Sequence, residues 1–255
     1  MRRLIVNADD CNLTAGVTRA ILECHERGIV SSTTWISNLP ANQEMVKLVI
    51  RSGLGVGVHL NVTLGKPLSK LADVGSLINS DGSFKKKSDY LKSPPEAQDL
   101  AHEYFQQILM FEKIFGKAPT HLDTHHQMHD EPDFMRVLAQ VAREKKLPIR
   151  RSALMQKVDF QKRYPGLVTT QMLCGDLDAH AFWTEEKFDK TVSELPAGVT
   201  EIMCHPGVLD DELRKITSMT VTREKEYRFF STPSLKKVLE RHKICLIHFG
   251  QLTED

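Results

Sequence analysis

The segment THLDTHHQMH, residues 120–129, concentrates side chains that can bind metal ions, with four histidines and one aspartate in ten positions. Each buried imidazole needs its own hydrogen-bond partner or ligand, so a core filled in this way is costly. Dense histidine clusters are typical of metal sites or of surface polyhistidine stretches. Pro119 and the strand-like sequence at 120–122 argue against a surface tract. We therefore interpret the segment as part of a metal site.

Two adjacent carboxylates, Asp9 and Asp10, follow the apolar run at 4–6. Because they repel each other, placing them side by side costs free energy unless a cation or a hydrogen-bond donor offsets their charge. The alternative is that Asp10 and Asn12 only cap the helix that follows. The pair by itself does not distinguish these roles.

Two isolated histidines follow or end predicted strands. His59 lies in the apolar run GVGVHLNVT, where a lone histidine is more often a hydrogen-bonded core residue than a ligand. His205 follows the strand-like stretch 201–204, and the turn residues at 206–207 come directly after it. His205 fits a structural and a catalytic role equally well. The histidine cluster at 120–129 favours a functional role for both histidines.

Short β-rich runs alternate with amphipathic stretches, a pattern that predicts βα units around a parallel sheet. Strands are expected at 4–6, 29–36, 54–62, from 120, 147–151, 167–173, 199–204 and 244–249. Helices are expected at 14–28, 42–52, 96–116, 132–146, 184–194 and 234–242. We therefore expect an α/β fold, a distorted (β/α) barrel with seven or eight mostly parallel strands. An open α/β sheet is the alternative.

The polar residues singled out above all fall just after, or at the end of, a predicted strand, and Asp123 and His126 share this placement. The carboxyl ends of parallel strands meet at one edge of a barrel or sheet, which is where such folds place their chemistry. The pattern therefore predicts one shared site.

The overall composition is that of a soluble globular protein and excludes some functions. The 255 residues fit one α/β barrel, so we expect a single domain over 1–255. The formal net charge is +1, from 34 basic and 33 acidic residues, which argues against nucleic-acid binding. The lysine triplet at 85–87 is interpreted as a solvated loop.

Cysteine usage and the N-terminus bear on the compartment. The five cysteines contain no C-x-x-C pair, which fits reduced thiols and a cytoplasmic location. No stretch approaches 18 apolar residues, and the N-terminal apolar run is too short for a signal peptide. We therefore expect neither a membrane span nor secretion.

Several motifs together resemble those of the YdjC-like carbohydrate deacetylases, the family that includes bacterial chitooligosaccharide deacetylases. The matching segments cover most of the chain, and the combination of THLDTHH with CHPG is specific. They are NADD at 7–10, RGIVSSTTWISN at 27–38, GVGVHL at 55–60, GKPL at 65–68, PTHLDTHH at 119–126, LPIR at 147–150 and EIMCHPG at 201–207.

The resemblance implies a role for each site residue. The metal ligands of the family fall on Asp10, His59 and His125, the base that activates water falls on Asp9, and the proton donor falls on His205. The family fold is a distorted (β/α) barrel, in agreement with the pattern of elements. A homodimer is also expected from the resemblance.

The chain departs from the family pattern at one place, since it reads ADDCN where ADDFG is usual. Cys11 and Asn12 shape the pocket beside the metal, so the departure bears on substrate preference. Cys11 is an alternative thiolate ligand, but in an extended segment its side chain points away from that of Asp10. Arg150 matches a family arginine, and it either holds a substrate hydroxyl or a site carboxylate or forms a structural ion pair.

These roles imply hydrolysis of the acetamide of an N-acetylated mono- or oligosaccharide, with release of acetate. One divalent ion lowers the pKa of water and polarises the carbonyl, while His126 and Asp123 orient the ligands from outside. The family resemblance implies Mg²⁺, whereas two imidazoles and one carboxylate suit Zn²⁺, Co²⁺ or Mn²⁺ better. The alternatives are a metal-dependent phosphohydrolase and a sugar-binding protein without catalysis.

Overall fold

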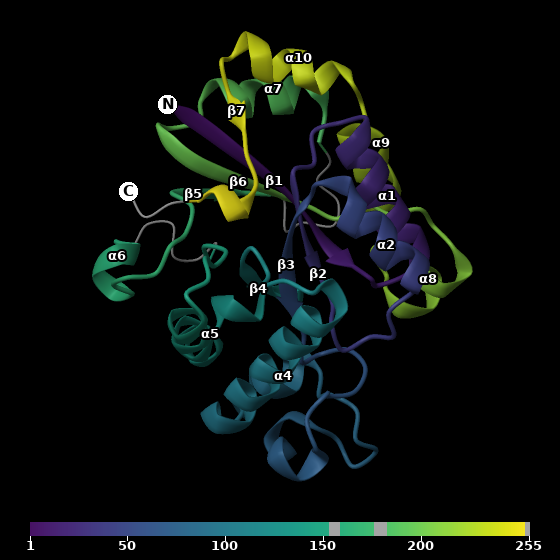
Figure 1. Cartoon of the computed structure of the whole chain (residues 1–255), viewed down its shortest axis with the longest axis vertical. Coiled ribbons are helices and arrows are strands. Elements are labelled where there is room, and N and C mark those ends of the chain that lie inside the picture. The colour runs from purple at the N-terminus through teal and green to yellow at the C-terminus, as the bar shows by residue number, and fades with distance from the viewer. Residues whose placement is uncertain (153–158, 176–182, 253–255) are drawn as a thin grey trace.

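The sheet at the centre of the molecule is parallel and curls into a half-barrel with helices around it (Figure 1). The computed structural model describes residues 1–152, 159–175 and 183–252. Within these residues the sheet has seven strands, in the order β4-β3-β2-β1-β6-β5, with β7 also paired to β1. The strands are β1 (Arg2–Cys11), β2 (Ser32–Trp35), β3 (Gly55–Leu60), β4 (Leu122–Thr124), β5 (Met172–Cys174), β6 (Gly198–Cys204) and β7 (Cys245–Leu246). The predicted distorted barrel of parallel strands is confirmed.

Strand β1 lies in the middle of the sheet and is buried on both faces. Its apolar run at 4–6 has no exposed surface, as expected for a parallel strand covered on both sides. At its start, Arg2 donates hydrogen bonds to the carbonyls of Ser193 and His242, which lie at the ends of two covering helices. The opposite end of β1 carries Asp9 and Asp10, so the core strand delivers both carboxylates to one edge of the sheet.

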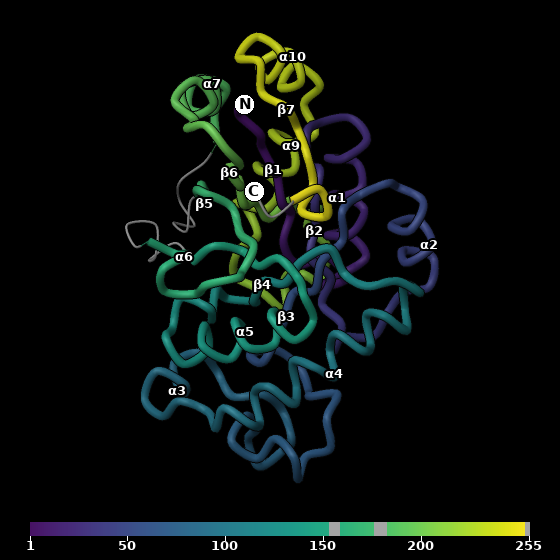
Figure 2. Tube along the Cα trace, turned by 60° about the vertical axis from the view of Figure 1, so that its left-hand side comes forward, coloured from purple at the N-terminus to yellow at the C-terminus, as the bar shows by residue number. Residues whose placement is uncertain are grey.

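The helices surround the sheet as βα units require (Figures 1 and 2). Helices α1 and α2 pack together, α9 packs against α1, and α4 packs against α5. The helices of the described residues are α1 (Ala15–Glu26), α2 (Gln43–Ser52), α3 (Lys87–Tyr90), α4 (Ala97–Phe115), α5 (Pro132–Lys145), α6 (Phe160–Arg163), α7 (Glu185–Ser193), α8 (Asp211–Ile216), α9 (Val221–Phe230) and α10 (Ser234–Arg241). The short helices α3 and α6, together with α8 and α9, were not expected from the sequence.

Three predicted strands are much shorter than expected, and one of them, 244–249, is reduced to the two residues of β7. The stretch 147–151 forms only an isolated bridge, at Ile149 to Leu122 of β4, and the stretch 167–173 is reduced to β5. Pro148 has no N–H to donate, which limits pairing beside it. Ile149 nevertheless donates to the carbonyl of Val168, so this irregular segment links β4 toward β5. It also carries Arg150 into the interior.

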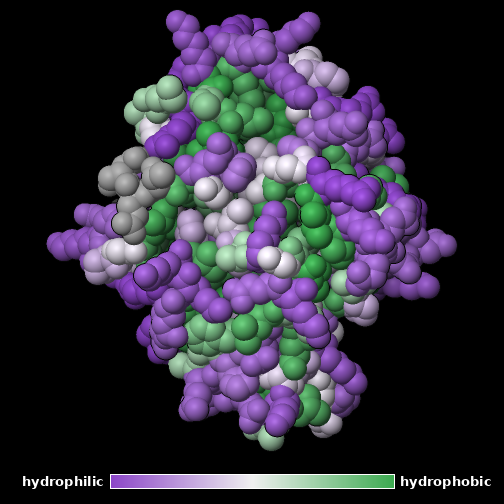
Figure 3. All heavy atoms as spheres, in the orientation of Figure 1, coloured by the Kyte–Doolittle hydropathy of each residue, from purple (hydrophilic) through white to green (hydrophobic). Residues whose placement is uncertain are grey.

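The surface is polar over the outer helices, and apolar atoms show between them toward the middle of the face in Figure 3. Among the described residues, no helix combines the length and the apolar character needed to cross a membrane.

The polar segment between β3 and α4 is held against the core by Glu103. This buried residue of α4 accepts hydrogen bonds from the backbone N–H groups of Leu68 and Ser69.

Candidate active site

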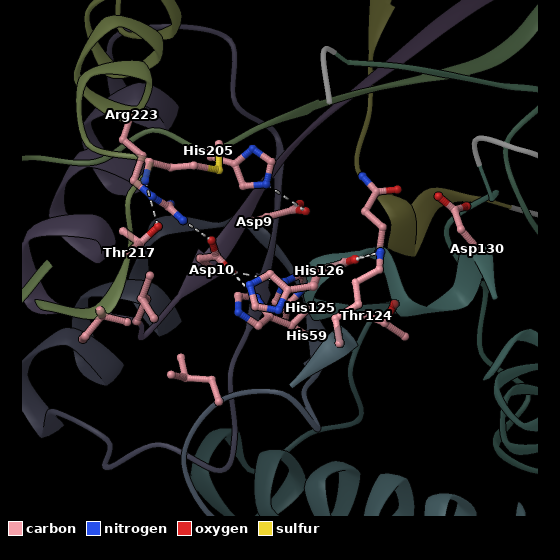
Figure 4. A pocket seen from close by; sticks show the side chains of 16 residues that line it. Asp9, Asp10, His59, Thr124, His125, His126, Asp130, His205, Thr217 and Arg223 are labelled. Carbon is pink, nitrogen blue, oxygen red and sulfur yellow. Dashed lines mark hydrogen bonds and ion pairs between the residues drawn. The ribbon is translucent and has the colours of Figure 1, made fainter. Parts of the chain in front are cut away.

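A cavity of about 500 Å³ opens at the carboxyl edge of the sheet. All five residues expected to do chemistry line it, namely Asp9, Asp10, His59, His125 and His205. They come from the ends of β1, β3 and β6 and from the turn after β4, and their side chains point toward one another in Figure 4. The predicted convergence of these strand ends on one site is thus observed.

Asp10, His59 and His125 present ligand atoms that lie close enough to hold one metal ion. Oδ1 of Asp10 lies 2.9 Å from Nδ1 of His125 and 3.2 Å from Nε2 of His59. The two imidazole rings stand edge to face with centroids 5.3 Å apart. One carboxylate oxygen and two imidazole nitrogens form the donor set of many zinc and other transition-metal sites. The residues therefore fit a divalent cation.

The backbone turns sharply at the end of β1 to aim Asp10 into the cavity. Asp10 and Asn12 have φ angles of 67° and 75°, in the left-handed region that Asp and Asn tolerate better than most residues. Thr14 caps α1 by accepting from the backbone of Val17, and the amide of Asn12 donates to the carbonyl of Ile36. Neither Asp10 nor Asn12 therefore serves as the helix cap.

Cys11 is directed away from Asp10, as the sequence predicted, but for a different reason. Neither Cys11 nor Asn12 lines the cavity, so the expectation that these two residues shape the pocket was wrong. The expected extended geometry is interrupted here, since Asp10 is left-handed and the register of β1 against β2 shifts between Ala8 and Cys11. The thiol lies in the core near the hydroxyl of Thr18, and burial raises the pKa of Cys11 to about 12. A thiolate ligand at Cys11 is not compatible with this environment.

His59 is held by residues on neighbouring strands. Its Nδ1 lies 2.6 Å from Oδ1 of Asp123 and 3.1 Å from the hydroxyl of Thr34. A proton on Nδ1 leaves the lone pair of Nε2 free to face the cavity. Burial opposes a charge on His59, but the carboxylates of Asp123 and Asp10 outweigh it and raise the pKa of His59 to about 10. Without a cation the environment of this ring therefore favours a proton on Nε2, and a bound cation would take the place of that proton.

Arg150 is fully buried and bound by three carboxylates. It makes two hydrogen bonds of 2.6 Å to Asp9, its Nη1 lies 2.9 Å from Asp123, and its Nε donates to Glu201 at 2.8 Å. Burial lowers the pKa of Arg150, but these carboxylates raise it well above its usual value. Of the roles left open for Arg150, the structure shows the ion pair with a site carboxylate.

Glu201 was not singled out from the sequence, where it looked like one polar residue in an apolar strand. On β6 it is fully buried beside Arg150, and its Oε2 has no hydrogen-bond partner among the described residues. Burial raises the pKa of Glu201 to about 7, although Arg150 opposes the shift. A polar residue at an inward-facing position of a central strand was the available signal.

His205 lies on the opposite side of the cavity from the histidine cluster (Figure 4). Its Nε2 is 3.7 Å from Oδ2 of Asp9, too far for a direct hydrogen bond. Burial lowers the pKa of His205, while the carboxylates of Asp9 and Asp10 act in the opposite sense. The backbone N–H of His205 donates to Oε2 of Glu226 at 2.5 Å.

His126 and Lys87 form part of the cavity rim. Nδ1 of His126 lies 2.8 Å from the hydroxyl of Thr63, so this ring belongs to neither of the ligand sets formed by the described residues. Lys87 lines the cavity and donates to the carbonyl of His126 at 2.9 Å. The interpretation of the whole lysine triplet as a solvated loop was therefore wrong for Lys87.

Arg223 is the main residue that the sequence did not reveal. It comes from α9, lines the cavity and pairs through Nη2 with Oδ2 of Asp10. Burial raises the pKa of Asp10, but Arg223 and then His125 hold it well below its usual value. Arg223, Glu226 and Phe230 follow the spacing of a buried helix face. Two of these three residues are charged, so the sequence lacks the apolar pattern by which a buried helix face is recognised.

Comparisons with known proteins identify the family of this chain. Residues 3–241 match the family model described as YdjC-like protein. A carbohydrate deacetylase of Clostridium beijerinckii is 32% identical over 98% of this chain and 100% of its own length. A carbohydrate deacetylase of Oceanobacillus iheyensis is 34% identical over 88% of this chain and 94% of its own.

Solved structures show the same fold. The crystal structure of a putative cellobiose-phosphate cleavage protein from Enterococcus faecalis has a TM-score of 0.89 and 29% identity, and 97% of each chain is covered. A family 4 carbohydrate esterase from Streptomyces lividans has a TM-score of 0.52 and 12% identity, covering 96% of this chain and 91% of its own. This second likeness concerns the fold alone. The resemblance inferred from the motifs is confirmed, and the chain belongs to the YdjC-like family.

Proposed function

We propose that this protein is a metal-dependent hydrolase that removes the acetyl group from N-acetylated sugars and releases acetate. The observation that carries the proposal is the meeting of Asp10, His59 and His125 with Asp9 and His205 in one cavity. The names of the curated relatives support a carbohydrate substrate. The substrate class proposed is a chitooligosaccharide or a related acetylated carbohydrate.

Asp10, His59 and His125 would hold the divalent ion. When bound, the ion supplies Lewis-acid polarisation of the acetamide carbonyl and lowers the pKa of water. Asp123 orients His59 through Nδ1, at 2.6 Å, so that Nε2 faces the site. Arg223 holds the second oxygen of Asp10, which leaves Oδ1 for the ion. Asp123 thus supports the site without supplying a ligand atom, and His126 lies beside His125 with ring centroids 3.9 Å apart.

Asp9 is the proposed general base. Its two oxygens are bound by the fully buried Arg150, and this fixes the carboxylate at the edge of the cavity. His205 approaches Oδ2 of Asp9 from the other side, at 3.7 Å. A water molecule attacking the acetamide would have the Asp9 carboxylate as an acceptor for its proton, the role that general-base catalysis requires.

His205 is the proposed proton donor to the departing sugar amine. The turn at 206–207 follows it directly, its backbone donates to Glu226, and the residue lines the cavity. Because burial lowers the pKa of His205, the protonated ring releases its proton more readily than an ordinary imidazolium does. Asp9 and Asp10 limit this effect and help His205 to acquire the proton.

A two-metal phosphohydrolase finds less support. Asp9, His59 and Asp123 form a second ligand set by distance. However, Nη1 of Arg150 lies 2.6 Å from Asp9 and 2.9 Å from Asp123, so a guanidinium already occupies the position between these carboxylates. A second cation beside a buried arginine would be repelled. A sugar-binding protein without catalysis would have no use for Asp9 and His205 at their observed positions.

The test is acetate release by metal-loaded protein from N-acetylglucosamine, diacetylchitobiose and longer oligomers. We expect release from at least one of them and none from the His59→Ala variant. Loss of phosphate from a sugar phosphate in place of acetate release would instead support the phosphohydrolase.

The metal's identity is a separate prediction. The family resemblance implies Mg²⁺, which prefers oxygen ligands, but the donor set offers two nitrogens and one oxygen. We expect protein purified without added metal to carry a transition metal, with zinc favoured, as measured by elemental analysis. Full reactivation of the chelated protein by micromolar Mg²⁺, but not by Zn²⁺ or Co²⁺, would contradict this.

The cytoplasmic location and the homodimer likewise remain predictions. Size-exclusion chromatography with light scattering tests the homodimer.

A further inference from the structure

Helix α9 buries two charged side chains, Arg223 and Glu226, which are 2% and 4% exposed. They lie one turn apart on the same face of the helix. Burying a charge is costly unless it is paired. Arg223 pairs with the carboxylate of Asp10, and Glu226 accepts the backbone N–H of His205.

Arg223 binds only one of the two carboxylate oxygens of Asp10. Its Nη2 binds Oδ2, whereas Oδ1 faces His125 and His59 at 2.9 and 3.2 Å. The remaining Nε and Nη1 of Arg223 have no hydrogen-bond partner among the described residues. Such buried donors cost about 1–3 kcal/mol each, so this arginine does not serve folding alone. Its position favours orientation of the Asp10 carboxylate.

Glu226 acts on the other half of the site. Its Oε2 accepts the backbone N–H of His205 at 2.5 Å. A second bond, from the N–H of Gly207 to the carbonyl of Arg223, is 3.1 Å long. A Cβ on Gly207 would lie 3.4 Å from both Cβ and Cδ of Arg223, so helix and turn are in close contact. The turn that carries His205 is therefore fastened to α9.

Helix α9 is itself anchored to the element that follows β1. The hydroxyl of Tyr227 donates to Glu23 of α1 at 2.5 Å, and the N–H of Ile29 donates to the carbonyl of Phe230 at 3.3 Å. Since α1 follows Asp9 and Asp10 almost directly, α9 keeps a fixed position relative to both carboxylates. Figure 1 shows α1 and α9 side by side.

We propose that Arg223 and Glu226 are positioning residues with divided tasks. Arg223 orients Asp10 for metal binding, and Glu226 orients His205 for proton transfer. The inference rests on the roles of Asp10 and His205 in the proposed function. It predicts that the two substitutions on one helix change different measured quantities.

The experiment compares Arg223→Gln and Arg223→Lys with Arg228→Gln, a control on the exposed face of α9. Zn²⁺ affinity is measured by competition with a chromogenic chelator. We expect Arg223→Gln to weaken Zn²⁺ binding about 10–100-fold, as is usual for residues that orient ligands. Arg223→Lys, which keeps one donor, should lie between this variant and the control. Zn²⁺ affinity in Arg223→Gln equal to that of the control would overturn the task assigned to Arg223.

For the second half, Glu226→Ala and Glu226→Gln are compared with Glu224→Ala. Glu226→Ala should lower kcat about 10–100-fold through misplacement of His205, with KM and Zn²⁺ affinity unchanged. Glu226→Gln should restore most of kcat, because its amide oxygen accepts the same N–H. If Glu226→Ala weakened Zn²⁺ binding as much as Arg223→Gln does, or if Glu226→Gln gave no rescue, α9 would be a structural support without divided tasks.

His59→Ala separates this inference from the proposed function. Retention of Zn²⁺ in His59→Ala would refute the metal site itself. Loss of Zn²⁺ in His59→Ala together with full affinity in Arg223→Gln would refute only the role of α9. Melting temperatures of all variants show whether each is folded. If Arg223→Gln or Glu226→Ala does not fold, Arg223→Lys and Glu226→Asp carry the test, since the shorter Asp withdraws the acceptor from the N–H of His205 and should lower kcat without weakening Zn²⁺ binding.

Discussion

The strand ends and helix α9 build the same cavity by different means. Asp9, Asp10 and His59 lie on strands whose carboxyl ends must meet once the sheet is parallel. Arg223 and Glu226 reach the cavity only because α9 packs against α1 and against the turn after β6. Topology alone brings the first group together, whereas the second group depends on tertiary packing. The two groups should therefore respond differently to substitution.

The largest effect is expected at the strand ends, in the histidine pair. His125→Ala removes a ligand atom, so metal and nearly all activity should be lost, as for His59→Ala. His126→Ala should lose far less, because that ring faces Thr63. Metal analysis of the purified variants decides between them. Metal loss in His126→Ala with retention in His125→Ala would mean that the other histidine of the pair is the ligand.

The next largest difference is expected between substitutions of the two neighbouring aspartates, Asp9 and Asp10. Asp9→Asn should keep the metal and lose about 10²–10⁴-fold in kcat, the usual contribution of a general base. The Asn oxygen can still accept from Arg150, so the fold should persist. Asp10→Asn should weaken metal binding itself. If Asp9→Asn released the metal and Asp10→Asn did not, the two roles would be exchanged.

His205 offers a test that depends on pH. His205→Asn should retain metal and substrate binding but lower turnover, and the basic limb of the pH profile of kcat/KM should disappear. A proton donor must be protonated, so activity falls as pH rises through its pKa. Burial lowers the pKa of His205, so we expect this limb below the ordinary histidine value of about 6.5. A basic limb that survives in the variant would belong to another group.

The sequence predicted the parts of the fold and site that depend on local patterns. Thr14 caps α1 and Gly116 ends α4, as their residue types indicated. Pro148 shortened a predicted strand because it cannot donate to a ladder. The left-handed turn at Asp10 could not be foreseen, because it arises from a shift in register between strands.

Buried charge was the feature that sequence patterns predicted least well. Arg223 and Glu226 sit in a charged stretch that is typical of a solvated helix face. Arg150 was recognised only through the family resemblance, and its three carboxylate partners are far away in the sequence. Ion pairs between distant elements leave no periodicity. Their partners become evident only when the strands are placed in order.

The last prediction concerns the pH dependence of stability and Glu201, whose carboxyl lies beside the buried Arg150. Because the pKa of Glu201 is raised to about 7 in the folded protein, folding favours its protonated form. Its stabilising contribution is present below the ordinary glutamate pKa of about 4.3 and is lost as pH rises through 7. Glu201→Gln cannot ionise, so between pH 5 and pH 8 its unfolding free energy should improve relative to the unsubstituted protein by about 3 kcal/mol. Urea unfolding of both proteins in chelator, with the exposed Glu194→Gln as control, measures this difference. A difference independent of pH would show that Arg150 keeps Glu201 ionised, and that the carboxylates around the arginine act as one fully charged cluster.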